Sequence, residues 1–310
     1  MTKLYAGIGS RYTPTSVLEC MYVLAAQLAL KGYTLRSGGA PGADSAFEYG
    51  CDSVCGLKEI WLPWERFENR DSPWLSSIEH AEIAETIHPY WNEITQGPQK
   101  LHARNVGQIL GPDCQTPVEF VICYTICGMT KRQERTLYSG GTATAIVLAA
   151  DYNIPVFNLG NAQSRRDLIS YLNQEKLMDD HDFEQQVLDL HLHDPESQEI
   201  FVFGSNLAGR HGRGAAKYAA QVCGAKRHQG FGMQGRSYAI PTKGYHLEPL
   251  SLDTICFNIG TFIRFAKAHP EKQFFVSEVG CGEAGYKPAQ IAPFFKEAPS
   301  NCKLPPGWRS

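Results

Sequence analysis

The sequence lacks any hydrophobic run long enough to cross a membrane. Although 43% of its 310 residues are hydrophobic, no uninterrupted apolar segment approaches the roughly 18 residues that a membrane-spanning helix needs. No secretory signal pattern precedes the apolar segment that begins at Leu4. We therefore expect a cytoplasmic protein with no membrane partner.

The chain also lacks an excess of positive charge. It contains 29 Lys and Arg against 32 Asp and Glu, which gives a net charge of -3 and a pI near 6.4. Proteins that bind along a nucleic-acid backbone usually carry a basic field. The balance argues against nucleic acid as a partner, whereas a small anionic ligand needs only a local cluster of donors.

Cysteine pairs with the spacing of a zinc or redox site are missing as well. The ten cysteines are scattered, and no two have the CxxC spacing of a zinc or redox site. Two pairs, Cys51 with Cys55 and Cys123 with Cys127, are four residues apart, which would place each pair on one face of a helix. We expect buried thiols, and we predict neither a metal site nor a bound cofactor.

Two glycine-rich segments stand out instead. SGGAPGADSAFEYG spans Ser37 to Gly50, and FGSNLAGRHGRGAAKYAA spans Phe203 to Ala220. Each follows an apolar run typical of a strand and precedes a run typical of a helix. Because such a loop aims backbone N–H groups and a helix N-terminus at one point, each predicts an anion-binding site.

Strand-like and helix-like segments alternate along the chain, as in an open parallel sheet with helices on both faces. We predict an α/β fold of two three-layer domains with mainly parallel sheets, covering residues 1–176 and 199–310 and joined by a linker at 177–198. The predicted strands are 3–10, 34–37, 58–64, 118–125, 154–159, 199–206, 237–243 and 273–280. The predicted helices are 17–30, 142–151, 165–174, 215–223, 251–268 and 289–295.

The N-terminal candidate site gathers loops at the carboxyl ends of parallel strands, where α/β sheets bind ligands. Asp44 and Glu48 share a helix face beside the first glycine loop, where carboxylates could hold ribose hydroxyls or stabilise an oxocarbenium ion. Alternatively, Asp44 caps the helix and Glu48 is solvated. The predicted ligand-binding residues are Gly9, Ser10, Arg11, Gly38, Gly39, Ala40, Gly42, Asp44, Arg104, Asn105, Gly140, Gly141 and Thr142, with Glu48 as the catalytic candidate.

The N-terminal motifs resemble those of a known superfamily. Five motifs follow one another within residues 1–172: GIGSR, SGGAPGADSAFEYG, KEIWLPW, HARN and SGGTATAIVLAADYNIPVFNL. This series resembles the SLOG superfamily of Rossmann-like domains. Its members include cytokinin-activating phosphoribohydrolases, DNA-processing protein A and nucleotide-sensing domains of bacterial conflict systems. The resemblance implies nucleotide binding and a homodimer. Because Val147 stands where the hydrolase signature has a Glu, any cleavage is left to Glu48.

The C-terminal candidate site has two glycine-rich turns. The Asn206 amide can both donate to and accept from ribose hydroxyls, and Tyr286 could stack on a base. Glu283 could face a reacting sugar. His211 is a general acid or base, or else an incidental loop residue. The segment between the turns, HQGFGMQGRSYAIPTK, is either part of the site or a plain hairpin. The ligand-binding predictions are Gly204, Ser205, Asn206, Gly212, Gly214, Gly280, Cys281, Gly282, Ala284, Gly285 and Tyr286, and the catalytic candidates are Glu283 and His211.

The C-terminal pattern resembles a divergent macro domain. The match covers residues 199–295 and rests on SNLAGRHGRGAA, a strand ending in PTK, and VGCGEAGY. It implies an ADP-ribose site, with the first loop at the distal ribose and the last around the diphosphate. His211 and Arg213 interrupt the family's triple glycine.

Both halves therefore predict a ligand of the ADP-ribose or NAD class. The first hypothesis is a protein that binds and hydrolyses an NAD-derived or ADP-ribosyl nucleotide at its glycosidic or ADP-ribosyl linkage. The second is a non-enzymatic sensor or sponge in a bacterial and phage conflict. The third is a DNA-binding protein resembling DNA-processing protein A, which the charge balance disfavours.

Overall fold

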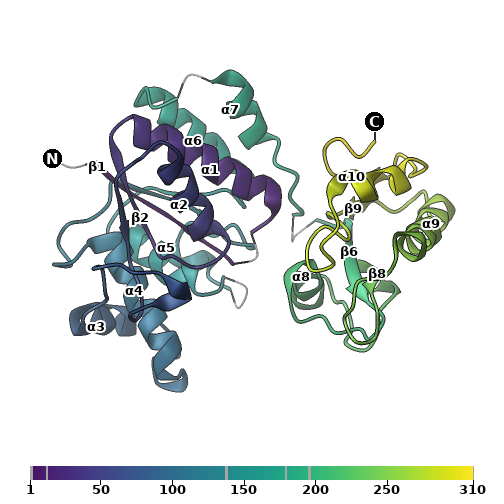
Figure 1. The fold of residues 1–310 in the computed structure, drawn as a ribbon, viewed down its shortest axis with the longest axis horizontal. Coiled ribbons are helices and arrows are strands. Elements are labelled where there is room, and N and C mark those ends of the chain that lie inside the picture. The colour runs from purple at the N-terminus through teal and green to yellow at the C-terminus, as the bar shows by residue number, and fades with distance from the viewer. Residues whose placement is uncertain (1–2, 12, 137–138, 179, 195–196, 310) are drawn as a thin grey trace. The chain divides into compact units, whose positions relative to one another are not determined.

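The computed structural model describes residues 3–11, 13–136, 139–178, 180–194 and 197–309. The chain divides into two compact units, Met1–Leu190 and His191–Ser310, called unit 1 and unit 2 below (Figure 1). The range predicted as a linker contains helix α7, His181–Leu188, whose N-cap Asp180 accepts a hydrogen bond from Phe183 N. Each unit has its own five-stranded sheet.

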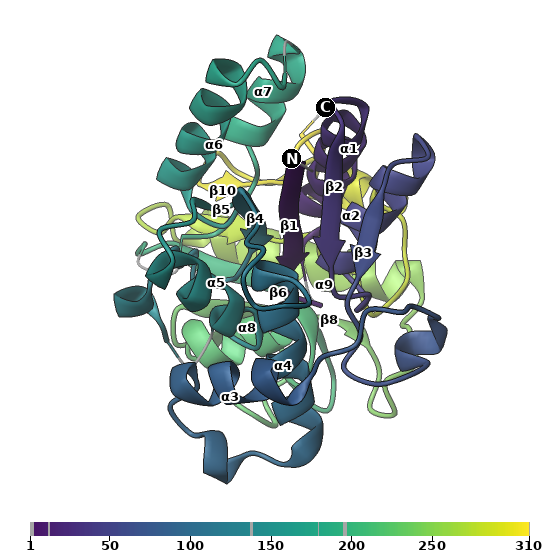
Figure 2. The same cartoon turned by 90° about the vertical axis from the view of Figure 1, so that its left-hand side faces the viewer.

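Unit 1 contains a five-stranded parallel sheet with the order β3-β2-β1-β4-β5 (Figure 2). After β3 the chain crosses to the other side of β1, so the strand order reverses between β1 and β4. In open α/β sheets this reversal opens a crevice at the carboxyl ends of the two strands. The strands are β1 Lys3–Gly9, β2 Tyr33–Ser37, β3 Lys58–Ile60, β4 Phe120–Tyr124 and β5 Val156–Asn158.

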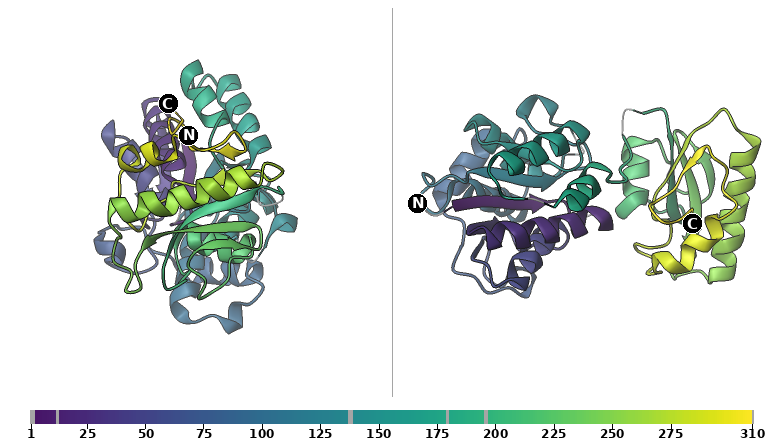
Figure 3. Two further views of the ribbon diagram at one scale, coloured as in Figure 1. Left: turned by 90° about the vertical axis from the view of Figure 1, so that its right-hand side faces the viewer. Right: turned by 90° about the horizontal axis from the view of Figure 1, so that it is seen from above.

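Helices cover both faces of this sheet (Figure 3). Because side chains alternate along a strand, Leu4, Ala6 and Ile8 of β1 pack with α3, α4 and α5, while Tyr5 packs edge-on against Phe47 of α2 on the other face. The helices are α1 Thr15–Leu30, α2 Ala43–Ser53, α3 Ile78–Ile87, α4 Gln96–Leu110, α5 Thr142–Asp151 and α6 Ala162–Gln174, with short 3₁₀ turns at Phe67–Asn69, Trp91–Glu93 and Arg132–Glu134.

Unit 2 has a sheet of the order β10-β9-β6-β8-β7, parallel except for β7. Here the strand order reverses between β6 and β9. The strands are β6 Ile200–Asn206, β7 Gly232–Gln234, β8 Ser237–Lys243, β9 Phe274–Val276 and β10 Cys302–Lys303. The helices are α8 Gly214–Val222, α9 Leu252–Ala268 and α10 Pro288–Ile291, followed by a 3₁₀ turn at Ala292–Phe295.

The segment just before β6 packs on the unit 2 sheet. The imidazole of His191 stacks on Phe275 with ring centroids 4.2 Å apart, and its Nε2 donates to Val276 O at 3.0 Å. His193 Nδ1 hydrogen-bonds the Tyr218 hydroxyl at 2.7 Å. Burial lowers the pKa of both imidazoles, that of His193 to about 4, so both are neutral at pH 7.

The α/β class with two mainly parallel sheets is confirmed. Helix 142–151 and strand 237–243 have the predicted bounds, and β7 and β8 form the hairpin that was one interpretation of their sequence. Strand 273–280 is shorter than predicted: β9 ends at Val276, because Val279 N turns back to Ser277 O. Among the described residues, no helix is long and apolar enough to span a membrane.

Candidate functional sites at the two sheet edges

The first candidate site lies at the carboxyl edge of the unit 1 sheet, where the loops after β1, β2 and β4 meet. A β-carbon on Gly9 would lie 2.7 Å from Ala43 Cβ and 3.1 Å from Tyr124 N, and one on Gly42 would lie 2.7 Å from Ser10 O. Gly42 also has a φ of 89°, which L side chains rarely adopt. These glycines let three loops approach one another at the strand reversal.

Asp44 occupies the interior of the first glycine loop. Its Oδ1 accepts from Gly9 N at 3.2 Å, and its Oδ2 accepts from Ala40 N at 3.3 Å. The side chain is 3% exposed, and burial raises the pKa of Asp44, opposed by Arg104 and by the two N–H donors. A carboxylate of the chain thus already accepts from this part of the loop, so the predicted use of Asp44 for ribose hydroxyls would require its side chain to leave these donors.

Arg104 of α4 reaches the same loop. Its Nη1 donates to Asp44 Oδ2 at 3.1 Å, and a β-carbon on Gly38 would lie 1.3 Å from that nitrogen. With its amide oxygen toward the loop, Gln108 accepts from Gly38 N at 2.7 Å and from Arg104 Nη1 at 3.2 Å. Arg104 Nε is buried and has no hydrogen-bond partner among the described residues, so the guanidinium still has donor capacity.

A second cation stands close enough to influence this guanidinium. Burial lowers the pKa of Arg104, the Asp44 carboxylate opposes that shift, and the positive charge of Arg11 adds to it. Arg11 is exposed and pairs with Glu68 at 3.3 Å across the surface. Because two guanidinium groups repel each other, an anion between them would be favoured electrostatically.

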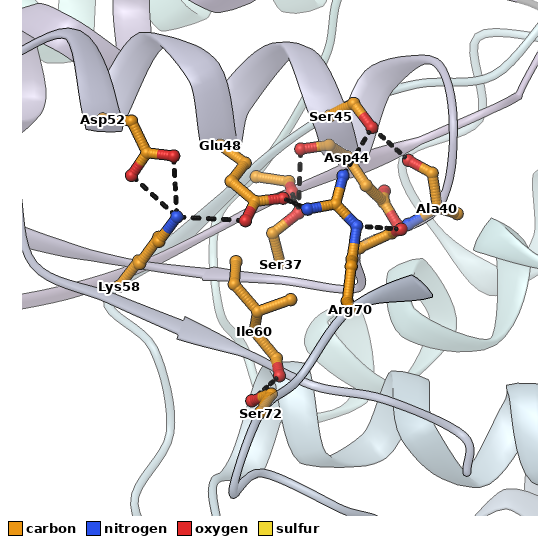
Figure 4. A network of polar contacts seen from close by, with 12 residues as sticks. Ser37, Ala40, Asp44, Ser45, Glu48, Asp52, Lys58, Ile60, Arg70 and Ser72 are labelled. Carbon is orange, nitrogen blue, oxygen red and sulfur yellow. Dashed lines mark hydrogen bonds and ion pairs between the residues drawn. The ribbon is translucent and has the colours of Figure 1, made fainter. Parts of the chain in front are cut away.

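Glu48 is held in an ion-pair network (Figure 4). Its Oε1 accepts from Lys58 Nζ at 3.0 Å, its Oε2 accepts from Arg70 Nη1, and its side chain is 8% exposed. Arg70 also donates through Nε to Gly39 O at 2.7 Å and through Nη2 to Ser45 Oγ at 3.0 Å. The Glu48 carboxylate therefore ties β3 and the loop carrying Arg70 to α2, and the structure places it among cations rather than in solvent.

The N-terminus of α5 borders the same edge and is open. The backbone N–H groups of Gly140, Gly141 and Thr142 have no hydrogen-bond partner among the described residues, and β-carbons on the two glycines would meet no atom within 4 Å. Two α4 side chains hold this turn: Asn105 Nδ2 donates to Gly141 O at 2.8 Å, and His102 Nδ1 bonds Thr144 Oγ1 at 2.8 Å. Asn105 therefore positions the turn.

The second candidate site lies at the carboxyl edge of the unit 2 sheet, where the strand order reverses between β6 and β9. A β-carbon on Gly204 would lie 3.2 Å from Gly280 N and 3.4 Å from Thr242 Oγ1, so the ends of β6, β8 and β9 converge there. Beyond this point the edge is open, because β-carbons on Gly212, Gly214, Gly282 and Gly285 would meet no atom within 4 Å. The predicted glycine residues thus border one edge.

Asn206 closes a turn within the first unit 2 loop. Its Nδ2 donates to Arg210 O at 2.7 Å, and its Oδ1 accepts from Arg210 N at 2.9 Å. Ser205 is buried beside it, and its hydroxyl donates to Asn206 O at 3.4 Å. These polar groups shape the loop, so the predicted use of Asn206 for ribose hydroxyls would require its side chain to leave this turn.

His211 is buried beneath the same loop, with 6% of its surface exposed. Its Nε2 donates to Gln229 O at 3.2 Å, its ring packs edge-on against Phe203, and its Nδ1 has no hydrogen-bond partner among the described residues. Burial lowers the pKa of His211. The neutral imidazole links the loop to the segment before β7.

The second unit 2 loop carries the remaining predicted residues. Tyr286 is partly buried and donates its hydroxyl to Leu250 O, while Glu283 is exposed and forms no ion pair with a described residue. Ala284 is buried and Cys281 is partly buried. The N–H groups of Gly282, Glu283 and Ala284 have no hydrogen-bond partner among the described residues.

Gln108, Arg70 and Thr242 are among the residues of these sites that were not predicted from the sequence. Gln108 lies one helical turn after Arg104 on α4, a spacing that places both on one face. Arg70 belongs to an irregular segment, and Thr242 ends β8 beside Gly204. Within the described residues, no three His, Cys, Asp or Glu side chains are grouped so that they could hold a metal ion.

No protein-family model matches the chain, and no curated protein matches it significantly.

Proposed function

We propose that the protein binds an NAD-derived or ADP-ribosyl nucleotide at its two sheet edges and hydrolyses the bond at a ribose anomeric carbon. The proposal draws on the SLOG-like and macro-like motifs and on the strand reversal in each sheet, with glycine-rich loops beside it. A homodimer and a cytoplasmic location, which the sequence suggests, belong to the same proposal.

The observation that carries the proposal is the incomplete pairing of Arg104. An arginine has five N–H donors, and a buried polar group without a partner costs roughly 1–3 kcal/mol. Arg104 Nη1 is bonded to Asp44 while its buried Nε is not. A phosphate beside Arg104 and Arg11 would supply further acceptors for these guanidinium groups, which already pair with Asp44 and Glu68.

The open end of α5 offers a second anchor at the same edge. The N–H groups of Gly140, Gly141 and Thr142, which have no partner within the described part of the chain, lie at the positive end of a ten-residue helix, which favours an anionic group. A ligand with a diphosphate, or with a phosphate and ribose hydroxyls, can use both the guanidinium groups and this helix end. In unit 2 the N–H groups of Gly282, Glu283 and Ala284, to which no described residue forms a hydrogen bond, would serve a diphosphate in the same way.

The catalytic role falls to Glu283 rather than to Glu48. Glu48 is held by Lys58 and Arg70, whereas Glu283 is exposed on a loop at the second edge. Water would attack the anomeric carbon of the ribose as the leaving group departs, and Glu283 would accept the proton from that water. A carboxylate also stabilises the oxocarbenium-like transition state electrostatically.

Mass spectrometry tests binding and turnover together. The full chain is incubated separately with NAD, ADP-ribose, cyclic ADP-ribose and nucleoside monophosphates, and both the bound and the converted species are identified. We expect turnover in the wild type and in Glu48→Gln, and binding without turnover in Glu283→Gln. Unchanged turnover in Glu283→Gln would reject this mechanism, and no bound nucleotide in any incubation would reject the proposal.

A non-enzymatic sensor or sponge is the second candidate. It is favoured because both carboxylates of the first site are engaged in ion pairs and because His211 Nε2 is engaged with a carbonyl. Such a protein would sequester a nucleotide signal, as in a conflict between bacteria and phages. Recovery of the bound nucleotide unaltered after long incubation would support this candidate over the enzyme.

A further inference from the structure

The net charge of the whole chain conceals a strong difference between its two units. Met1–Leu190 contains 15 Lys and Arg and 23 Asp and Glu, whereas His191–Ser310 contains 14 and 9. Unit 1 is therefore acidic, with a formal charge of -8, and unit 2 is basic, with a formal charge of +5. The charge argument against a polyanionic partner applies to the chain as a whole and not to unit 2.

The positive charge of unit 2 is concentrated in one stretch. Residues 200–247 contain no Asp or Glu at all, and they carry half of the basic residues of unit 2. These are Arg210, Arg213, Lys217, Lys226, Arg227, Arg236 and Lys243. The stretch runs from β6 through α8 and β7 to the end of β8.

The fold brings three loops of this stretch together at the carboxyl ends of β6 and β8, which are parallel neighbours. Gly209 O accepts from His228 N at 3.0 Å, and a β-carbon on Gly230 would lie 2.3 Å from Asn206 O. Leu207 N donates to Lys243 O at 2.9 Å. The loop after β6, the loop before β7 and the end of β8 therefore form one continuous surface.

Five cations lie on these joined segments, and we call them the basic edge: Arg210, Arg213, Lys226, Arg227 and Lys243. The first four are exposed and Lys243 is partly exposed. None of the five forms an ion pair with a described residue. Their charges are thus not neutralised by carboxylates of the described chain.

Two exposed aromatic rings accompany the basic edge. Phe231 is 70% exposed and follows Gly230 in the loop before β7, and Tyr245 is 63% exposed and lies two residues after Lys243. A phenylalanine this exposed forgoes the stabilising free energy that burial of its apolar surface would contribute. Aromatic rings beside cations are the combination that binds unpaired bases and their phosphates.

We propose that the basic edge of unit 2 binds single-stranded nucleic acid. The five cations contact successive phosphates, and Phe231 and Tyr245 stack on unpaired bases. A duplex would present phosphates to the cations but no base faces to the two rings, and an acidic peptide would likewise leave the rings without stacking partners. The basic edge shares the loop after β6 with the second candidate site, but the inference does not depend on the hydrolysis proposed above.

Fluorescence anisotropy with the full chain tests this site. The probe is a fluorescein-labelled oligothymidine of about 20 nucleotides, which exceeds the roughly 4–16 nucleotides that common single-strand sites cover. Binding is measured from about 50 to 200 mM salt for the wild type, for Lys226→Ala/Arg227→Ala and for Phe231→Ala. The matched controls are Lys267→Ala/Lys296→Ala, which removes two cations of unit 2 outside the basic edge, and Tyr152→Ala, an exposed ring of unit 1.

We expect binding that weakens with salt. Because each phosphate contact on a single strand contributes about 0.7 to the slope of log K against log salt, the double variant should lower that slope by about 1.4. Phe231→Ala should weaken binding about tenfold, and both controls should bind like the wild type. Circular dichroism checks that each variant is folded, as expected for exposed side chains.

Several results would overturn the proposal. These are no binding at the lowest salt, equal losses in the basic-edge and control variants, or a preference for duplex that does not respond to Phe231→Ala. Competition by poly-glutamate as effective as competition by unlabelled oligothymidine would instead indicate an acidic protein partner, and it would also reject the assignment to nucleic acid.

Discussion

Arg104 Nη1 donates to Asp44 Oδ2 across 3.1 Å, and both side chains are more than nine-tenths buried. The pair joins α4 to α2 through the first glycine loop, whose N–H groups at Gly9 and Ala40 point to the same carboxylate. The loop therefore holds an anion that the chain itself supplies. Any external anion must use the remaining donors of Arg104 and the open end of α5.

Removal of the Asp44 carboxylate should destabilise the protein strongly. Asp44→Ala leaves a buried guanidinium without its counter-charge and also removes an acceptor from two backbone N–H groups. Breaking a buried pair from one side typically costs about 3–5 kcal/mol. Urea unfolding followed by circular dichroism should show a lower midpoint with an unchanged slope.

The double variant Asp44→Ala/Arg104→Met is the control for this interpretation. Replacing both partners removes the uncompensated charge, so the loss of stability should be smaller than the sum of the two single losses. Strictly additive losses would show that the two side chains stabilise the fold independently.

Substitution of two glycines at the same edge should have opposite consequences. In Gly38→Ala the added methyl would lie 1.3 Å from Arg104 Nη1, so the guanidinium must move and the free energy of unfolding should fall by more than about 2 kcal/mol. Gly141 has an ordinary helical φ and open space around it, so Gly141→Ala should unfold like the wild type and weaken nucleotide binding. Equal midpoints for the two variants would contradict the packing around Gly38.

Neutralising Glu48 and Glu283 in turn should separate stability from chemistry. Glu48→Gln weakens contacts to Lys58 and Arg70 in a nearly buried network, and we expect a loss of about 1–3 kcal/mol. Glu283→Gln changes an exposed loop residue and should stay within about 0.5 kcal/mol of the wild type. Thermal melts of both variants measure this, and a Glu48→Gln melt identical to the wild type would show that the network contributes nothing.

Buried histidines should make the protein less stable in mild acid. Burial lowers the pKa of His102 in unit 1 and of His193 in unit 2 to about 4, whereas an unfolded chain titrates histidine near 6.5. Between these values the unfolded state binds protons that the folded state does not, so stability is complete above about pH 6.5 and declines as the pH falls towards 4.

Urea midpoints measured from pH 7 to about 4 test this dependence. We expect a decline on the order of 2 kcal/mol for each of the two histidines. The decline should be smaller in His193→Gln, which cannot gain the proton. A His193→Gln profile parallel to that of the wild type would mean that His193 titrates normally in the folded state.

Hydrophobic periodicity was sufficient to predict most of the fold. Helix 142–151 and strand 237–243 are continuous apolar or alternating segments, and their bounds in the structure are as predicted. Periodicity could not locate where β9 ends, because its last predicted residues are turned by local backbone hydrogen bonds. It also missed most of α4, whose polar Arg104, Asn105 and Gln108 look solvent-facing in sequence but are buried by tertiary pairing.

The candidate sites were predictable only in part, for the same reason. Glycine spacing located both loops, and the parallel pattern placed them at the carboxyl edges of their sheets. Partners distant in sequence were not predictable: Glu48 meets Arg70 from an irregular segment, and Asp44 meets Arg104 sixty residues away. The sequence left open whether Asp44 and Glu48 face a ligand or serve as a helix cap and a solvated carboxylate, whereas in the structure each is paired with an internal cation.

Titration calorimetry of ADP-ribose into the intact protein tests the central claim most directly. If both sheet edges bind a nucleotide of this class, the wild type should take up two molecules per chain, and folded Arg104→Met should take up one. Absence of binding heat with ADP-ribose, and likewise with NAD, would contradict the account.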